Sequence, residues 1–221
     1  MAFSSCDPIY SWGGEIFTGS LGEDGFPHGN GTLYFTESGT FYTGKFNLGK
    51  FSGYGALVFH EGRRYFGSFK NNLMHGKGVY VTSDRIVCHG DFKWGEMNGY
   101  GEIYYPEGGI YQGQVEKNMA HGHGKLIEAN GLIYVGDFFK NYMQGTGKWI
   151  NVRENISYQG EFEAGMKHGR GVVTFGNGDT LQAFFLNGKM FGEGVYKKNE
   201  TGETFFVEFQ SSDSMSSAFQ D

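Results

Sequence analysis

An internal repeat runs through almost the whole chain. A large or apolar side chain, which usually stands two residues before a glycine, recurs at Phe17, Tyr42, Tyr65, Cys88, Tyr111, Tyr134, Tyr158, Leu181 and Phe205. A G-x-G pair begins at Gly29, Gly53, Gly76, Gly99, Gly122, Gly145, Gly169 and Gly192. Both series advance by about 23 residues, the period of a stacked supersecondary unit. The chain is therefore predicted to be an array of repeats.

Composition favours strands as the elements of this array. The 221 residues include 39 glycines, 22 phenylalanines and 14 tyrosines but only 3 prolines. Glycine costs about 1 kcal/mol in a helix interior, whereas aromatic residues favour strands. So few prolines exclude collagen, and so many aromatic residues argue against a disordered chain. We expect an all-β fold of short strands and tight turns.

Each repeat is predicted to be a hairpin in which aromatic rings lie over glycines. Tyr42, Gly44 and Phe46 point to one face of a first strand, because alternate side chains share a face. Gly53 and Gly55 do the same on the second strand. A glycine leaves a slot that a neighbouring ring can cover. The two residue types are thus expected to form a ladder on one face.

The remaining glycines are expected in turns. Glycine or asparagine, the residues that best tolerate a positive φ, recurs three positions after the second aromatic residue of the first strand, as Gly49 follows Phe46. These positions are Gly49, Asn72, Gly95, Asn118, Asn141, Gly165 and Gly188. Between repeats stand the hairpin dipeptides Ser38-Gly39, Glu61-Gly62, Glu107-Gly108, Asn130-Gly131 and Asn177-Gly178.

The pattern resembles the MORN (membrane occupation and recognition nexus) repeat over residues 9–209. The motif stands in this chain as Tyr65-Phe66-Gly67-Ser68-Phe69, followed by a turn and then His75-Gly76-Lys77-Gly78. The resemblance implies an elongated, single antiparallel sheet of about eight hairpin repeats with half repeats at both ends. Departures from the motif are Cys88, Val115, Ala183 and Val207.

The repeats define the expected organisation of the chain. We predict an N-terminal extension at 1–8, a half repeat at 9–13, eight repeats at 14–201 and a closing half repeat at 202–210. In the opening half repeat, Tyr10 is aligned with Tyr104. Residues 211–221 lose the pattern and are expected to be a disordered tail.

Charge and cysteine content exclude several classes of function. The formal net charge is −6, and no basic run exceeds two residues, so neither nucleic acid nor a polybasic membrane anchor is expected. Cys6 and Cys88 make no disulfide framework, and no signal region or apolar stretch of about 20 residues is present. We expect a cytoplasmic protein.

No enzymatic chemistry is predicted. His28, His75, His121 and His168 each precede a G-x-G pair, but they recur two repeats apart, which indicates polar residues at strand starts and not metal ligands. Gly145-Thr146-Gly147-Lys148 lacks the Ser or Thr that a phosphate loop needs after its lysine. Neither a catalytic group, a metal nor another cofactor is expected.

The face opposite to the ring ladder is the candidate binding surface. Its residues are apolar through the middle of the array and become polar in the last two repeats, at Ser157, Gln159, Thr174, Thr180, Gln182 and Lys197. A single-layer sheet leaves such a face uncovered, and large exposed apolar patches mark binding sites. The predicted partner-binding residues are Tyr34, Phe41, Val58, Phe66, Val81, Val87, Tyr104, Ile110, Ile127, Ile133, Val135 and Ile150.

These features favour a non-catalytic scaffold or adaptor that binds an amphipathic helix or an extended segment of a protein. The resemblance to MORN proteins favours a cytoskeletal, ciliary or flagellar assembly. Two alternatives are a phospholipid-binding module at a membrane surface, against which the acidic charge counts, and a self-associating structural protein, for example a homodimer.

Overall fold

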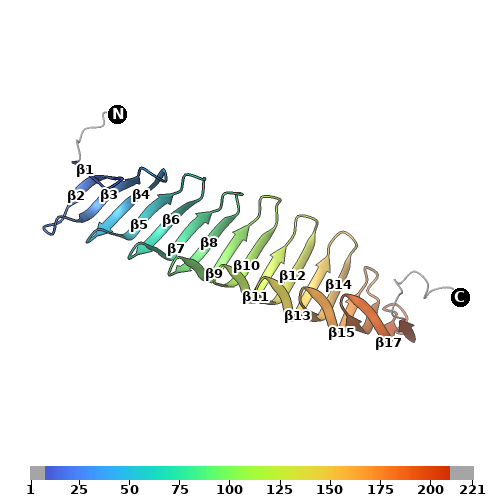
Figure 1. Ribbon diagram of the computed structural model, residues 1–221. Helices are drawn as coiled ribbons and strands as arrows, with labels where there is room; N and C mark the ends of the chain where they lie inside the picture. The colour runs from blue at the N-terminus through green and yellow to red at the C-terminus, as the bar shows by residue number, and fades with distance from the viewer. Residues whose placement is uncertain (1–7, 210–221) are drawn as a thin grey trace. The chain divides into compact units, whose positions relative to one another are not determined.

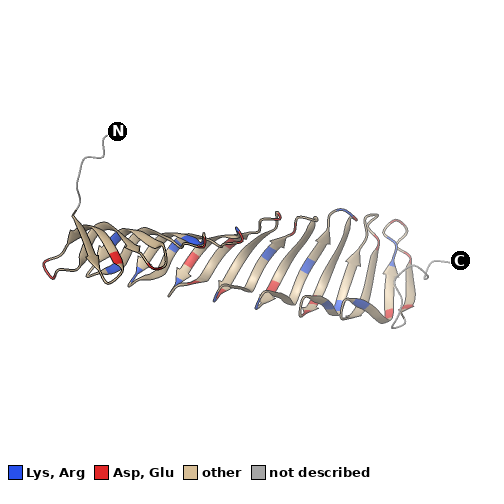
Figure 2. Ribbon diagram, turned by 45° about the horizontal axis from the view of Figure 1, so that its top comes forward, with Lys and Arg blue, Asp and Glu red and all other residues tan. Residues whose placement is uncertain are grey.

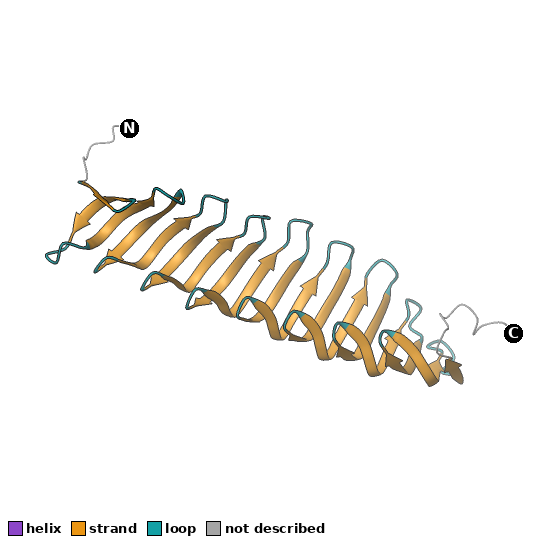
Figure 3. Cartoon of the chain, viewed as in Figure 1, coloured by secondary structure: helices purple, strands orange, loops and turns teal. Residues whose placement is uncertain are grey.

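The fold is all-β, as predicted. The computed structural model describes residues 8–209, and within this range it contains 18 strands and no helix (Figures 1 and 3). Most of the predicted N-terminal extension and the predicted disordered tail lie outside the described residues. Within each of two compact units, a strand pairs antiparallel with its neighbours along the chain, so the repeats are successive hairpins of a sheet. The strands divide into two compact units, residues 8–106 and 107–209.

The first unit contains nine strands in chain order. They are β1 (Ile9–Trp12), β2 (Glu15–Leu21), β3 (Pro27–Phe35), β4 (Thr40–Asn47), β5 (Lys50–Val58), β6 (Arg64–Lys70), β7 (Leu73–Val81), β8 (Val87–Lys93) and β9 (Glu96–Tyr104).

The second unit repeats the same plan. Its strands are β10 (Ile110–Glu116), β11 (Met119–Ile127), β12 (Leu132–Phe139), β13 (Tyr142–Asn151), β14 (Ile156–Glu163), β15 (Met166–Thr174), β16 (Thr180–Leu186), β17 (Lys189–Lys197) and β18 (Thr204–Phe209).

A two-residue bulge interrupts the hairpin of each repeat. In the β4–β5 hairpin, Gly44 pairs with Gly55 but the next residue, Lys45, pairs with Ser52. Gly53 and Tyr54 are thus extra residues of β5, and Gly53 takes the left-handed φ of +58° that the bulge requires. Because two residues are skipped, side chains on either side of the bulge keep their faces. The predicted division into two faces is therefore preserved.

The ring ladder forms the core of each unit. Tyr42, Tyr65, Tyr111, Tyr134 and Tyr158 are at most 2% exposed. A Cβ atom added to Gly147 would lie 2.5 Å from the Tyr134 ring, so the ring occupies the slot that glycine leaves. Phe138 meets that ring edge-on, with 5.1 Å between centroids.

The tyrosine hydroxyls tie the ladder to the bulges. Tyr134 donates to the carbonyl of Asp137 at 2.9 Å, and its equivalents Tyr42, Tyr65, Tyr111 and Tyr158 donate to the carbonyls three residues further on. Burial raises the pKa of Tyr42, Tyr65 and Tyr158 to about 12, which keeps these buried donors uncharged. Tyrosine, unlike phenylalanine, thus serves both as core ring and as donor.

Cys88 departs from the motif, and another residue compensates for the missing ring. The Met97 methyl group fills the space over Gly101 that a tyrosine at position 88 would cover. Met97 is only 2% exposed. A flexible thioether can fill an irregular gap of this kind.

The turns of the hairpins from β4–β5 to β16–β17 are type I′ turns, in which both central residues have a positive φ, whereas the longer segment 22–26 joins β2 to β3. The predicted glycine or asparagine is the second of the two, as at Asn72 (φ +68°). The sequence pattern does not predict a positive φ at the first central position. There even Leu48 (φ +51°) and Trp94 (φ +56°) adopt the left-handed conformation. The Asn72 side chain also accepts a hydrogen bond from the backbone of Phe51 at 2.7 Å, so this turn ties two successive hairpins together.

Arg85 occupies a position with a positive φ at which other turns between repeats have glycine, so replacing it by glycine should change the stability of the protein. It has φ +69° where the equivalent Gly62 has φ +91°. Left-handed backbone costs an L-residue about 1 to 2 kcal/mol, and glycine's extra freedom in the unfolded chain offsets about 0.4 to 1 of this. Arg85→Gly is expected to raise the free energy of unfolding in urea by about 0.5 kcal/mol, and Gly62→Arg to lower it. A clear loss of stability in Arg85→Gly would contradict the strain.

The opening half repeat is shifted by one residue from its predicted alignment. Tyr10 pairs with Phe17, as Leu33 pairs with Tyr42, so Tyr10 is equivalent to Ile103 and not to Tyr104. The cause is the turn: only Gly13 and Gly14 separate β1 from β2, whereas the other turns between repeats are longer.

Candidate binding surface

The predicted binding residues lie on the face opposite to the tyrosines, in two rows that cross the strands. The first row of unit 1 follows directly paired residues from strand to strand: Ile16, Tyr34, Phe41, Val58, Arg64, Val81, Val87 and Tyr104. The first row of unit 2 begins with Ile110, Ile127, Ile133 and Ile150 and continues with Ser157, Thr174, Thr180 and Lys197. The row of unit 1 is thus apolar except for Arg64, whereas the row of unit 2 changes from isoleucines to polar residues after Ile150.

Two of the predicted residues belong to a second row, which lies two residues nearer the bulge on each strand. Phe66 lies there between Ala56 and Val79, and Val135 lies between Lys125 and Lys148. Arg64 occupies the place in the first row that would otherwise be apolar on β6. The apolar row of unit 1 is therefore interrupted by a charge, whereas the four isoleucines of unit 2 are continuous.

Exposure varies along these rows. Tyr34, Phe66, Tyr104 and Val135 are exposed, whereas the other eight predicted residues are half-buried. Neighbouring side chains of the same row shield one another, because paired side chains stand about 5 Å apart. The isoleucines of unit 2 therefore form a packed apolar stripe rather than isolated protrusions.

The same face of unit 2 has shallow hollows. One, of about 450 Å³, is lined by His123, Val135, Lys148, Gln159 and Glu161, among others. Two smaller hollows of about 190 and 370 Å³ lie near Ile150 and near Phe184. Charged residues of both signs are scattered over the strands and turns (Figure 2). All three hollows are open to solvent and would not enclose a small molecule, so the surface suits a macromolecule better.

Several exposed aromatic and aliphatic residues were not predicted as candidates. Tyr54 and Tyr100 stand at bulges and are 75% and 56% exposed, and Leu48, Trp94 and Tyr142 lie at or beside the two-residue turns. Their signal in the sequence is an apolar residue at a position that the repeat otherwise gives to polar residues or glycine. They lie outside the two rows, toward the bulge and turn end of the strands.

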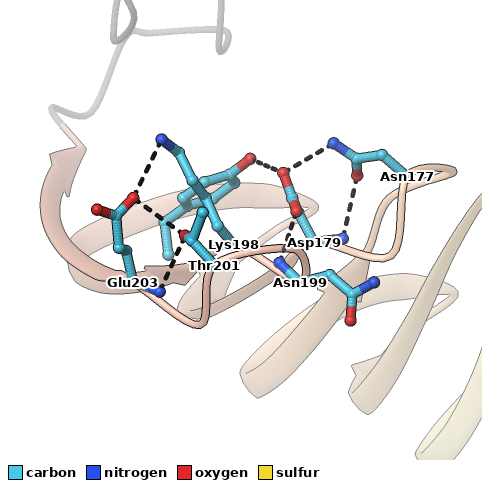
Figure 4. Close-up of polar contacts among 7 residues, drawn as sticks. Asn177, Asp179, Lys198, Asn199, Thr201 and Glu203 are labelled. Carbon is cyan, nitrogen blue, oxygen red and sulfur yellow. Dashed lines mark hydrogen bonds and ion pairs between the residues drawn. The ribbon is translucent and has the colours of Figure 1, made fainter.

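A buried carboxylate joins the last two turns between repeats (Figure 4). Asp179 accepts hydrogen bonds from the Tyr196 hydroxyl, from the Asn177 side chain at 2.8 Å and from the Asn199 backbone at 2.8 Å. The bond from Tyr196 is the main cause that lowers the pKa of Asp179. Among residues 8–209 no three His, Cys, Asp or Glu side chains are grouped as a metal site, and this cluster acts as a clamp between turns.

The family follows from a match along most of the array. The model of the MORN repeat matches residues 23–40, 42–62, 65–85, 88–110, 111–133, 134–150, 158–180 and 182–199. This chain belongs to the MORN-repeat family. The MORN repeat is a non-enzymatic module that binds protein or membrane, and the matched segments include the ladder residues Tyr42, Tyr65, Tyr111, Tyr134 and Tyr158.

Solved structures similar to this MORN-repeat protein share little sequence with it. One is the TCP domain of SAS-4 (dCPAP) from Drosophila melanogaster with a proline-rich motif of Ana2: identity is 7%, coverage 95% of this chain and 94% of that chain, and the TM-score 0.35. Another is a mutant of the TCP10 domain of Danio rerio CPAP. Its sequence identity is 11%, the match covers 91% of this chain and 99% of that chain, and the TM-score is 0.38. At such TM-scores neither likeness carries an argument. No curated protein matches the chain.

The part of the chain that the structure describes has no helix with the length and apolar character needed to cross a bilayer.

Proposed function

We propose that this MORN-repeat protein is a non-catalytic scaffold that binds an amphipathic helix of a partner protein on the isoleucine stripe of unit 2. The observation that carries the proposal is the register of Ile110, Ile127, Ile133 and Ile150, which stand directly opposite one another on four successive strands. An uncovered apolar stripe on a single-layer sheet has no role in the core, which lies on the other face.

The spacing of the stripe suits a helix that crosses the strands. Paired strands are about 4.8 Å apart, and successive turns of an α-helix are about 5.4 Å apart. Apolar residues on one side of such a helix, at i, i+3 or i+4 and i+7, can therefore meet successive isoleucines.

Charge defines which helix fits. Lys125 and Lys148 flank Val135 in the second row, next to the stripe, and both side chains are exposed. A helix with acidic residues beside its apolar side would pair with them, and such pairs favour one orientation and faster association. We extend the proposal to a cytoplasmic setting and, on the resemblance to MORN proteins, to a cytoskeletal, ciliary or flagellar assembly.

Ile133→Glu tests the stripe. The charge is hydrated in the free protein and desolvated under a bound helix, so the variant is expected to lose the partner while its melting temperature changes little. Ser157→Glu is the matched control, because Ser157 lies in the same row beyond the stripe. Immobilised wild-type and variant proteins would be incubated with extract of the source cells, and bound proteins identified by mass spectrometry.

The supporting result is a partner that Ser157→Glu retains, that Ile133→Glu loses, and whose binding segment, as a synthetic peptide, gains helical circular dichroism on binding. A partner retained by Ile133→Glu contradicts the stripe, as does unfolding of this variant. Stable co-flotation with phosphoinositide liposomes at about 0.15 M salt would favour the membrane alternative over a protein partner.

A further inference from the structure

The two end strands are complementary halves of one repeat. Among the described residues, β18 pairs only with β17 and β1 pairs only with β2. By register, β18 is the first strand of a hairpin, because Phe205 stands opposite Tyr196 as Tyr42 stands opposite Leu33. In the same way β1 is the second strand of a hairpin, because Tyr10 is equivalent to Leu33. Each strand presents one edge whose backbone groups can accept a further strand.

Side chains of both end strands are more exposed than their equivalents inside the array. Phe205 is 43% exposed, although the tyrosines at its position are at most 2% exposed. Phe206 is 84% exposed, whereas the equivalent Phe66, which has a strand on both sides, is 46% exposed. Ile9 is 72% exposed. The apolar residues at the two edges thus lack the neighbours that a further strand provides elsewhere.

The internal register predicts which residues would meet. Within repeats, the residue at the position of Phe206 pairs with the residue at the position of Ile9, as Phe66 pairs with Val79. Extending this register across two copies brings Phe206 opposite Ile9, Phe205 opposite Tyr10 and Thr204 opposite Ser11. The two most exposed apolar residues of the end strands would then cover each other, and an aromatic residue opposite a β-branched residue is a favourable cross-strand pair.

We propose that β18 of one copy pairs antiparallel with β1 of a second copy, so that the two half repeats form one composite repeat. This contact continues, between copies, the hairpin interface that joins the strands of every repeat within the chain. The Asp179 cluster fixes the turn that precedes β18, because Asp179 accepts a hydrogen bond from the backbone of Asn199 in that turn (Figure 4). Since the two surfaces differ, the contact is heterologous and leaves a free edge at each end of a dimer.

The proposal is independent of the isoleucine stripe and is tested by mass in solution. Sedimentation or light scattering of the full chain over increasing concentration should show a mass that grows beyond the monomer. Phe206→Lys and Ile9→Lys should each remain monomeric, because a lysine placed in the contact would be desolvated opposite an apolar side chain. Tyr54→Lys is the control: Tyr54 is also highly exposed but lies away from both edges, so its mass should follow the wild type.

Mixing the two end variants gives the sharpest readout. Phe206→Lys keeps an intact β1 and Ile9→Lys keeps an intact β18, so an equimolar mixture should form a two-chain species that grows no further. Melting curves of both variants, unchanged from the wild type, show that the chains are folded. A wild type that stays monomeric overturns the proposal. So does a dimer that survives in Ile9→Lys, since this would indicate pairing of β18 with β18.

Discussion

Replacing Tyr134 by alanine is expected to lower the free energy of unfolding by about 3 to 5 kcal/mol, the range for large aromatic side chains removed from a core. The ring is 2% exposed, it covers Gly136 and Gly147, and the Phe138 and Phe162 rings pack against it edge-on at 5.1 and 4.9 Å. Glycines have no side chains that could move into the cavity. The loss therefore includes both the buried area and an unfilled space.

Tyr134→Phe is the matched control, because it removes only the hydroxyl that donates to the Asp137 carbonyl. Its expected cost is about 1 kcal/mol. Repeat arrays can unfold in parts, so urea unfolding by circular dichroism should be accompanied by hydrogen exchange across β12, β13 and β14. Equal effects of the alanine and phenylalanine variants would show that the ring itself contributes little.

Gly147→Ala should produce an effect of similar size by the opposite change. The added Cβ would lie 2.5 Å from two Tyr134 atoms, in a site where the backbone φ is not in the left-handed region, so the cost is steric. Overpacking of this kind costs about 1 to 3 kcal/mol, and we expect the upper end because a ring held between strands cannot swing aside.

A double-mutant cycle isolates this contact. In Gly147→Ala combined with Tyr134→Ala, the methyl group enters the space that the ring has left. The double variant should therefore be more stable than the sum of the two single losses predicts, by about 1 to 3 kcal/mol. Additive losses, measured by urea unfolding, would mean that the ring does not fill the slot over Gly147.

The sequence could predict the ladder because its causes are local. Whether a residue leaves a slot or fills one depends on its own side chain, and alternation along a strand places Tyr134 and Gly136 on the same face. The same holds for turns, where Asn72 and Gly62 show a need for positive φ. The positive φ of Arg85, Leu48 and Trp94 could not be predicted in this way, because pairing of the flanking strands imposes it on residues that do not favour it.

The candidate surface could be predicted only in part. Alternation placed the twelve residues on the correct face, but it could not assign them to rows, because a row depends on the register between strands. The structure therefore separates Phe66 from the first row and puts Arg64 there. Whether the twelve residues bind a partner stays a prediction.

By itself, the sequence determined the all-β class, the hairpin repeat and the face that carries the core, because each follows from side-chain size and backbone freedom within a few residues. Only the tertiary structure decided the two-residue bulges, the filling of the Cys88 gap by Met97 and the one-residue shift of Tyr10. These features depend on which strand lies beside which, and on how many residues separate paired strands. Pairing between strands also decides that, within residues 8–209, β1 and β18 each keep one unpaired edge, because hydrogen bonds of the sheet are satisfied by neighbours and not within a strand.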